Sequence, residues 1–267
     1  MIEPIIAAAA KANPERPGDY RQDGLLYCGQ CRTPKEYALP DVTVRCMCAC
    51  EVAKYEAEEA EKQDKQRRAY IDRLRRDSQC DPAATFANAD NSPTLDKCRR
   101  YVTAWPKMYA DNIGLLLWGN TGNGKTFAAA CIANALMDQA VPVLMTSFPR
   151  VLANITGLFG DERAEYIDDL TGYKLLVIDD LGAERQSEFA LEMVYSVIDL
   201  RYRAKKPLIV TTNLTLEEIK NPRNMDYQRI YDRILEMCVP IHFVGESKRK
   251  SAHAKKVKMV RELFEEG

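Results

Sequence analysis

Residues 119–126 read GNTGNGKT, and this short stretch constrains the fold more than any other part of the chain. Its spacing is G-x-x-x-x-G-K-T, with an apolar run at 115–118 before it and a helix-prone segment, FAAACIANALMDQ, after it. Glycines at these positions let the backbone curl so that its N–H groups face phosphate oxygens, and the next helix adds its positive end. The pattern therefore predicts a strand, a phosphate-binding loop and a helix in succession.

The loop residues have separate predicted tasks. Lys125 should reach the β and γ phosphates of a nucleoside triphosphate, and the Thr126 hydroxyl should bind Mg²⁺. The rest of the loop should surround the phosphates with backbone N–H groups: Gly119, Asn120, Thr121, Gly122, Asn123 and Gly124. We therefore predict ATP or ADP, together with Mg²⁺, as ligands.

Two further apolar runs end in polar side chains. Residues 174–181 read KLLVIDDL, and residues 207–213 read PLIVTTN. Asp179 fits the carboxylate that holds Mg²⁺, usually through water, and Asp180 lies where a carboxylate can orient or deprotonate the attacking water. The plainer alternative is a pair of solvated carboxylates at the end of a strand. The phosphate-loop pattern upstream favours the catalytic interpretation, and Asn213 adds a polar residue at the end of the next strand.

Strand and helix patterns alternate along the rest of the chain. Further strand patterns cover residues 142–146 and 239–244, and helical patterns cover residues 189–202 and 226–237. Such alternation predicts a parallel sheet with helices packed against it. Because ligands of open α/β sheets bind at the carboxyl ends of the strands, we expect the nucleotide at that edge. The predicted fold class is α/β.

Five of the nine cysteines form two clusters near the N-terminus. Residues 27–31 read YCGQC, in which Cys28 and Cys31 have the C-x-x-C spacing of a zinc knuckle, and residues 45–50 read RCMCAC. The other four cysteines are scattered singly, and we expect them to pack in the core. The sequence thus predicts a metal site near the N-terminus.

The second cluster has one thiol too many for a tetrahedral site. A zinc ion binds four ligands at about 2.3 Å from each sulfur, so only two of the three later cysteines can join the first pair. In an extended chain Cys46 and Cys50 would lie about 13 Å apart, which favours adjacent members of the triplet. We predict Cys46 with Cys48. The pair Cys48 with Cys50 stays open, because Cys50 lies near the start of a predicted helix, where a thiolate is stabilised.

The composition decides how these thiols are interpreted. The first residues have no basic start and their apolar stretch breaks at Lys11, so we expect no secretory signal. No apolar run approaches the roughly 20 residues that cross a bilayer, so we expect no membrane partner. A reducing cytoplasm is the expected compartment, where clustered cysteines bind metal more often than they form disulfides. The net charge of −1 alone gives no reason to expect nucleic acid.

A highly charged segment follows the cysteines. From Glu51 to Arg76 the chain changes from mainly acidic to mainly basic, and it contains neither glycine nor proline. This order complements a helix dipole, and i,i+4 pairs such as Asp64 with Arg68 support a helix. A disordered charged linker is the alternative. We predict three parts: a cysteine-rich zinc-binding head at 1–51, a charged linker helix at 52–80 and an ATPase domain at 81–267.

Five motifs occur in an order that resembles one known family: GNTGNGKT, VIDDLGAER, IVTTNL, RIYDRILE and GESKRK. In this order they resemble the bacterial helicase loaders of the DnaC/DnaI type. The transposition ATPase IstB is a close relative, and both belong to the AAA+ superfamily of P-loop NTPases. The match covers roughly residues 85–250. The cysteine-rich head resembles, more loosely, loader homologues of phages and other mobile elements.

The resemblance implies roles for particular residues. It makes Asn213 the sensor-1 residue, which places water against the γ-phosphate, and Arg233 the arginine finger, which reaches a neighbouring subunit's nucleotide. Arg249 is similar to the sensor-2 arginine, which contacts nucleotide in its own subunit. Many AAA+ proteins carry Glu where this chain has Asp180, and loaders of this type share the Asp, so slow turnover is expected. Without the resemblance, a place on a solvated helix face would be the preferred interpretation of Arg233.

The resemblance also implies a function. It implies an ATP-dependent loader that binds a hexameric replicative helicase, delivers it to single-stranded DNA and self-associates through its ATPase domain. The alternative is an IstB-like transposase helper that selects target DNA. A small-molecule kinase would need neither an intersubunit arginine nor a metal head. A zinc-dependent DNA-binding module would have a degenerate ATPase site, whereas Lys125, Asp179 and Asn213 form a complete set. We expect Phe148 in the core rather than stacked on a base.

Overall fold

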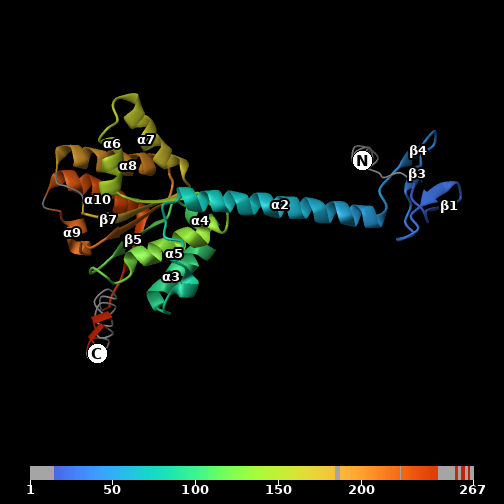
Figure 1. The fold of residues 1–267 in the computed structure, drawn as a ribbon. Helices are drawn as coiled ribbons and strands as arrows, with labels where there is room; N and C mark the ends of the chain where they lie inside the picture. The colour runs from blue at the N-terminus through green and yellow to red at the C-terminus, as the bar shows by residue number, and fades with distance from the viewer. Residues whose placement is uncertain are drawn as a thin grey trace. The chain divides into compact units, whose positions relative to one another are not determined.

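The computed structural model describes most of the chain: residues 15–183, 187–222, 224–245, 256–257, 260–261 and 264. The chain divides into two compact units, residues 1–69 and residues 70–267. The boundary falls within one long helix, α2 (Ala49–Asp77), so the two units are described separately (Figure 1).

The first unit contains two short antiparallel hairpins and most of α2. Strand β1 (Tyr20–Gln22) pairs with β2 (Leu25–Tyr27), and β3 (Glu36–Ala38) pairs with β4 (Thr43–Arg45). Among residues 15–69, buried side chains are few, and cysteines and charged groups predominate among them: Leu26, Cys28, Lys35, Glu36, Cys46, Cys48 and Glu51. A unit this small cannot rely on apolar burial alone, and units of this size usually carry a disulfide or a metal.

Helix α2 is the predicted linker helix, and it begins and ends three residues before the predicted bounds of 52–80. Most of its residues are exposed. The expected pair forms, with Arg68 Nη2 lying 2.7 Å from Asp64 Oδ2. In its last turns Leu74 is buried in the core of the second unit, and Arg75 pairs with Asp138.

The second unit is built on a five-stranded sheet whose neighbouring strands are all parallel. The strand order is β6-β7-β8-β5-β9, so the first strand in sequence lies between the fourth and the fifth. The strands have these bounds: β5 Gly114–Trp118, β6 Val143–Ser147, β7 Leu175–Leu181, β8 Leu208–Thr212 and β9 Cys238–His242.

Helices cover both faces of this sheet (Figure 1). Because side chains alternate along a strand, Leu115 and Leu117 pack in the core beneath α3 and α5, whereas Leu116 packs in the core beneath α6, α8 and α10. Two buried cores, one on each face, make the sheet the rigid centre of the unit. The helices have these bounds: η1 Phe86–Asn88, α3 Pro93–Thr103, α4 Trp105–Ala110, α5 Lys125–Met137, α6 Phe148–Ile155, α7 Asp161–Gly172, α8 Glu188–Arg203, α9 Leu216–Lys220 and α10 Met225–Met237.

The predicted α/β fold is confirmed. All five predicted strands are present, with ends within two residues of the predicted ones, and the helices predicted at 189–202 and 226–237 are α8 and α10. Phe148 begins α6 with its side chain fully buried, as expected of a core residue. In the part of the chain that the structure describes, we find no helix with both the length and the apolar character to cross a membrane.

One buried arginine, Arg201, binds backbone groups at the starts of two neighbouring strands. The Arg201 side chain on α8 is fully buried, and its guanidinium donates hydrogen bonds to four backbone carbonyls: Leu170 at 3.5 Å, Tyr173 at 2.8 Å, Lys174 at 3.3 Å and Pro207 at 2.6 Å. Burial lowers the pKa of Arg201 to about 10, so the side chain stays charged at neutral pH. These bonds join the end of α7 to the starts of β7 and β8.

We expect Arg201→Met to destabilise the second unit by at least about 4 kcal/mol. Hydrogen bonds from charged donors contribute about 1.5–3 kcal/mol each, and the four carbonyls would stay buried without a donor. Urea unfolding of the full chain measures the loss. Arg203→Met is the matched control on the same helix, because that side chain is largely exposed and an exposed ion pair contributes under about 1 kcal/mol. Equal effects of the two substitutions would contradict this role for Arg201.

Candidate functional site

The phosphate loop joins β5 to α5, as predicted. Gly119 has φ +138°, and a Cβ there would lie 2.4 Å from the carbonyl oxygen of Phe243. Gly124 has φ +88° and directly precedes the first residue of α5. Only glycine adopts both conformations without strain, so the sequence forces the tight curve that brings the loop over the N-terminus of α5.

Lys125 is the buried cation of this loop. Its ammonium donates hydrogen bonds of 2.8 Å to the carbonyl oxygens of Gly119 and Asn120 and to the side-chain oxygen of Asn213. The contact between Lys125 and Asn213 joins residues that are 88 positions apart in sequence, at one edge of the sheet. A hollow of about 290 Å³ opens in front of them, lined by Thr121, Gly122, Gly124, Lys125, Thr126, Phe127, Asp180 and Asn213.

Asp180 enters this hollow because β7 is irregular at its end. The pairing of β7 with β8 shifts register between Ile178 and Leu181, and Asp180 has φ +54°. Such bulges re-aim a side chain, and Asp tolerates the left-handed region better than most residues. The Asn213 amide donates a 3.4 Å hydrogen bond to the Asp180 carboxylate. The lysine, the asparagine and the second acidic residue therefore form one connected set.

Thr211 on β8 is a contributor that the sequence analysis missed. Its hydroxyl donates a 2.6 Å hydrogen bond to the carboxylate of Asp179 and accepts one of 2.9 Å from the backbone N–H of Asp180. Thr211 thus fixes both acidic residues. Asp179 is held by this bond and is not among the residues that line the hollow, whereas Thr126 is. The sequence feature that points to Thr211 is its position two residues before Asn213 in PLIVTTN, which in an extended chain places both side chains on the same side.

Arg233 lies on α10 and is paired within its own chain. One guanidinium nitrogen lies 2.7 Å from a carboxylate oxygen of Asp199, and the guanidinium carbon lies 4.6 Å from the centre of the Tyr195 ring. Less than a quarter of the Arg233 side chain is exposed. Arg203 binds the other oxygen of Asp199 at 2.8 Å. The remaining predicted arginine, Arg249, lies outside the described residues.

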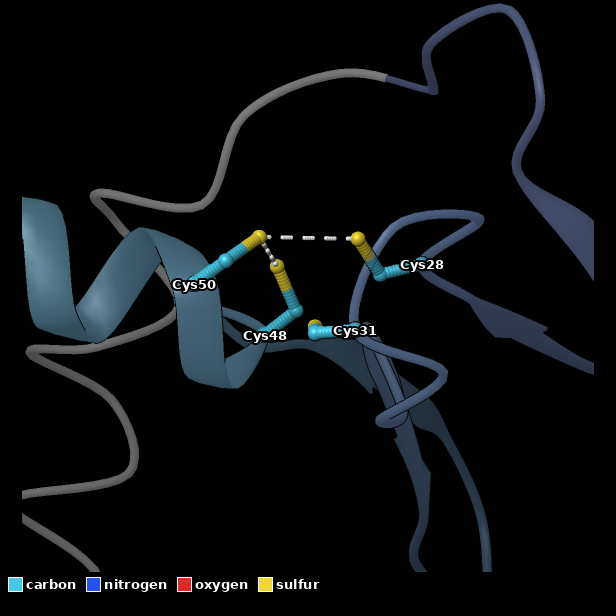
Figure 2. Close-up of side chains that lie close together, drawn as sticks. All are labelled: Cys28, Cys31, Cys48 and Cys50. Atoms are coloured by element: carbon cyan, nitrogen blue, oxygen red, sulfur yellow. Dashed lines mark hydrogen bonds between the residues drawn. The ribbon is translucent and has the colours of Figure 1, made fainter.

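Four cysteines of the first unit converge on one point (Figure 2). The sulfur atoms of Cys28, Cys31, Cys48 and Cys50 all lie within 4.8 Å of one another. The Cys28 and Cys50 sulfurs are 3.6 Å apart, and those of Cys48 and Cys50 are 3.2 Å apart. Four sulfurs at about 2.3 Å from a tetrahedral ion would lie about 3.8 Å from one another, so the spacing fits a zinc ion. All nine cysteines, which lie in the described residues, are free thiols.

The structure favours Cys50 over Cys46 as the fourth ligand. The sequence favours Cys46 with Cys48. In the structure, Cys46 lies at the end of the β3–β4 hairpin, where its N–H donates a hydrogen bond to the carbonyl of Lys35. Its sulfur lies 3.5 Å from the carbonyl oxygen of Pro34 and outside the four-sulfur cluster. Because α2 begins at Ala49, the chain turns there and brings Cys50 back beside Cys48. The prediction of Cys46 is corrected on this geometry.

The surroundings of the cluster shift the pKa values of two of its thiols in opposite directions. A hydrogen bond with the Thr33 hydroxyl, 3.1 Å away, lowers the pKa of Cys31 to about 5, and thiolates are the metal-binding form of cysteine. The same hydroxyl accepts a hydrogen bond from the N–H of Ala49, which joins the first knuckle to the start of α2. Burial raises the pKa of Cys48. Four neighbouring thiolates repel one another, and a bound cation removes that repulsion.

The fold and the phosphate loop together are those of a nucleotide-binding protein with an AAA+ fold. The profile of the family described as IstB-like ATP binding protein matches residues 55–256. The match covers more than half of the chain, and the chain belongs to this family.

Curated relatives include two helicase loaders. The replicative helicase loader DnaI of Bacillus subtilis is 27% identical over 181 residues, which are 62% of this chain and 58% of DnaI. The replicative helicase loader DnaC of Escherichia coli K12 is 29% identical over 143 residues, or 51% of this chain and 57% of DnaC. The putative insertion sequence ATP-binding protein y4pL of Sinorhizobium fredii is 30% identical over 53% of this chain and 58% of that protein. The chain thus spans less than two thirds of the length of each.

Solved structures share the fold. A crystal structure of DnaI superposes with a TM-score of 0.52 at 24% identity, covering 62% of this chain and 91% of that one. AMPPCP-bound DnaA from Aquifex aeolicus superposes with a TM-score of 0.52 at 15% identity, covering 68% and 56% of the two chains. At these identities the likeness establishes the AAA+ fold.

Proposed function

We propose that this chain is an ATP-dependent helicase loader that works in the cytoplasm and self-associates through its ATPase domain. It binds a hexameric replicative helicase, delivers it to single-stranded DNA and releases it through the ATP cycle. The relatives named replicative helicase loaders support this function. The observation that carries it is that Lys125, Asn213 and Asp180, from three separate motifs, form one hydrogen-bonded set.

The site suggests how hydrolysis would work. Phosphate oxygens would replace the carbonyl acceptors that Lys125 now contacts, and the loop N–H groups would bind the same phosphates. Thr126 and Asp179 would hold Mg²⁺, which supplies charge neutralisation at the phosphates. Asp180 would orient or deprotonate the attacking water, with Asn213 placing that water, and Arg249 would contact the nucleotide of its own subunit. An acidic side chain in this role contributes about 10²–10⁴ in rate.

We further propose that the cysteines bind one structural zinc ion per chain, through Cys28, Cys31, Cys48 and Cys50. The chemistry of the donors fits this ion, because four thiolates in a closed tetrahedron are a common structural zinc site. The three proposed parts are the head at 1–51, the linker at 52–80 and the AAA+ domain at 81–267. The head would bind the helicase, and the AAA+ domain would bind nucleotide and DNA.

The binding step has a direct test. The full chain, immobilised, should retain the purified replicative helicase of its source organism, and Cys28→Ser should abolish retention because it removes a metal ligand. Lys107→Ala, a change on α4 of the AAA+ domain and remote in sequence from the head, is the control that should bind normally. Equal retention by the Cys28→Ser protein would contradict helicase binding through the metal-bound head.

The second candidate is an IstB-like transposase helper that selects target DNA. The family description and the likeness to y4pL favour it. The same immobilised chain should then retain a transposase of the insertion-sequence type and not the helicase. Retention of the helicase alone would remove this candidate.

We propose that Arg233 acts on the nucleotide of a neighbouring subunit. Arg233→Ala should bind ATP normally, yet lose most of the stimulation of hydrolysis that assembly produces. An arginine finger supplied across a subunit interface raises the rate of phosphoryl transfer about 10³–10⁵-fold in other enzymes. The rate increase should be smaller in an ATPase with slow turnover. Steady-state hydrolysis with and without single-stranded DNA measures the effect. Arg203→Ala is the matched control, because Arg203 binds the same Asp199 carboxylate from an exposed position.

Mixing the Arg233→Ala and Lys125→Ala proteins distinguishes an arginine finger that acts on a neighbouring subunit from a role of Arg233 within its own subunit. Arg233→Ala protein keeps an intact phosphate loop, and Lys125→Ala protein keeps an intact finger, so mixed assemblies should recover part of the lost hydrolysis. Recovery would place Arg233 at a neighbour's nucleotide. Absence of recovery in assemblies shown to contain both variants would mean that Arg233 acts within its own subunit or only structurally.

A further inference from the structure

We infer that Lys35 is the positioning residue of the cysteine site, joining its two cysteine pairs and balancing their charge. The inference rests on the metal site proposed above and concerns residues that do not themselves bind the ion. The two pairs come from separate segments of the head: Cys28 and Cys31 follow β2, whereas Cys48 and Cys50 lie at the start of α2. Lys35 lies between these segments in sequence and bonds to both.

The backbone of Lys35 joins the two hairpins. Its N–H donates a 2.7 Å hydrogen bond to the carbonyl of Leu26, two residues before the first cysteine of the site. Its carbonyl accepts a 2.8 Å hydrogen bond from the N–H of Cys46, two residues before Cys48. The segments that lead into both cysteine pairs are therefore held by one residue.

The side chain of Lys35 lies buried between two carboxylates. Only 2% of it is exposed, and its ammonium lies 2.8 Å from an oxygen of Asp19 and 3.7 Å from an oxygen of Glu51. Both of these carboxylates are themselves 4% exposed. Buried charges are costly to desolvate, and this small unit contains three of them in contact.

Each carboxylate in turn holds the backbone of one cysteine pair. Asp19 accepts a 3.0 Å hydrogen bond from the N–H of Gly29, inside the first knuckle. Glu51, the third residue of α2, accepts a 3.3 Å hydrogen bond from the N–H of Cys48, just before the helix. This return bond is half of a capping box. Lys35 therefore reaches both pairs through one carboxylate each, as outer-shell partners do around metal ligands.

The charge of Lys35 also favours the metal-bound state. Four thiolates around a divalent ion carry a net charge of about −2, which a nearby buried cation partly offsets. Asp19 and Glu51 are balanced by Lys35 and Arg16, whose guanidinium lies 3.2 Å from Glu51. Burial alone would lower the pKa of Lys35, but the hydrogen bond to Asp19 and the nearby carboxylates raise it. Loss of this cation would leave two buried carboxylates beside an anionic cluster.

The test is the metal affinity of the full chain, measured by competition with a chromophoric zinc chelator. Lys35→Met should bind zinc about 10–100-fold more weakly, the range found for loss of an outer-shell partner. Lys54→Met is the matched control, since it removes an equal charge three residues beyond Glu51 from a side chain that is 75% exposed. It should leave the affinity unchanged. Normal ATP binding by each variant shows that the rest of the chain is folded.

A neutral triple variant, Asp19→Asn with Lys35→Met and Glu51→Gln, removes all three charges and leaves no buried ion uncompensated. It should stay at least about 10-fold weaker than the unchanged chain. With Co²⁺ in place of zinc, its thiolate charge-transfer band should appear at correspondingly higher metal concentration. Recovery of full affinity in the triple variant, or an unchanged affinity in Lys35→Met, would overturn the role of Lys35. Failure of the unchanged chain to bind metal would instead remove the metal site itself.

Discussion

Removal of zinc from the full chain should unfold the head and leave the AAA+ domain folded. Structural zinc sites of this kind contribute about 10–16 kcal/mol of apparent binding free energy, and the head buries few apolar side chains that would hold it otherwise. Hydrogen exchange with and without a chelator is the measurement. Amides of the β1–β2 and β3–β4 hairpins should lose their protection, whereas those of β5 should keep it.

Serine substitutions at Cys50 and Cys46 test which of these two cysteines binds the proposed zinc ion. Cys50→Ser removes a proposed ligand and should lower the zinc content well below one ion per chain. Cys46→Ser changes a buried thiol whose sulfur lies outside the cluster, and it should retain one ion per chain. Elemental analysis distinguishes them. Loss of zinc from the Cys46→Ser protein and not from the Cys50→Ser protein would contradict the assignment.

Lys125→Ala should weaken ATP binding by roughly 100-fold. Hydrogen bonds from a charged donor contribute about 1.5–3 kcal/mol, and about 1.4 kcal/mol corresponds to a factor of ten in affinity. The substitution also removes the bond that joins the phosphate loop to Asn213. Titration with a fluorescent ATP analogue measures the loss.

Asp180→Asn is the matched comparison in the same hollow. It should bind ATP about as well as the unchanged chain, because it alters the activation of water and leaves the loop intact. Hydrolysis should fall by roughly 10²–10⁴. If Lys125→Ala and Asp180→Asn lost ATP affinity equally, the division of roles between them would be wrong.

The meeting of Lys125, Asp180 and Asn213 could be predicted because each of them lies in a recognisable motif. Glycine spacing fixes the loop, and parallel strands bring their carboxyl ends to one edge, so Asp180 and Asn213 had to approach Lys125. The position of Thr211 two residues before Asn213 was visible in the sequence, but its role depends on the register of β8 against β7 and on the bulge before Leu181.

The cysteine site was predictable in kind and not in detail. Spacing alone indicated that the cysteines meet, but it could not choose among Cys46, Cys48 and Cys50, because the choice depends on where α2 begins. A helix that starts at Ala49 brings Cys50 beside Cys48, whereas an extended chain would not. The buried charges of Lys35, Asp19 and Glu51 gave no sequence signal, because they meet only when the two hairpins fold together.

Arg233 shows a different limit. The resemblance implied a role across subunits, and a single chain can only show which contacts the arginine makes within its own subunit. Within its own subunit, Arg233 is held by its ion pair with Asp199. Whether it reaches a neighbour's nucleotide is decided by the mixing experiment.

Helicase loading on circular single-stranded DNA tests the central proposal most directly. A hexameric ring cannot thread onto a circle without being opened, so unwinding of a labelled strand annealed to the circle reports loading. With the cognate helicase, unwinding should require this chain and ATP, and Lys125→Ala protein should not support it. Unwinding that is unaffected by the chain, under conditions where the chain is shown to bind ATP and the helicase, would contradict the proposal.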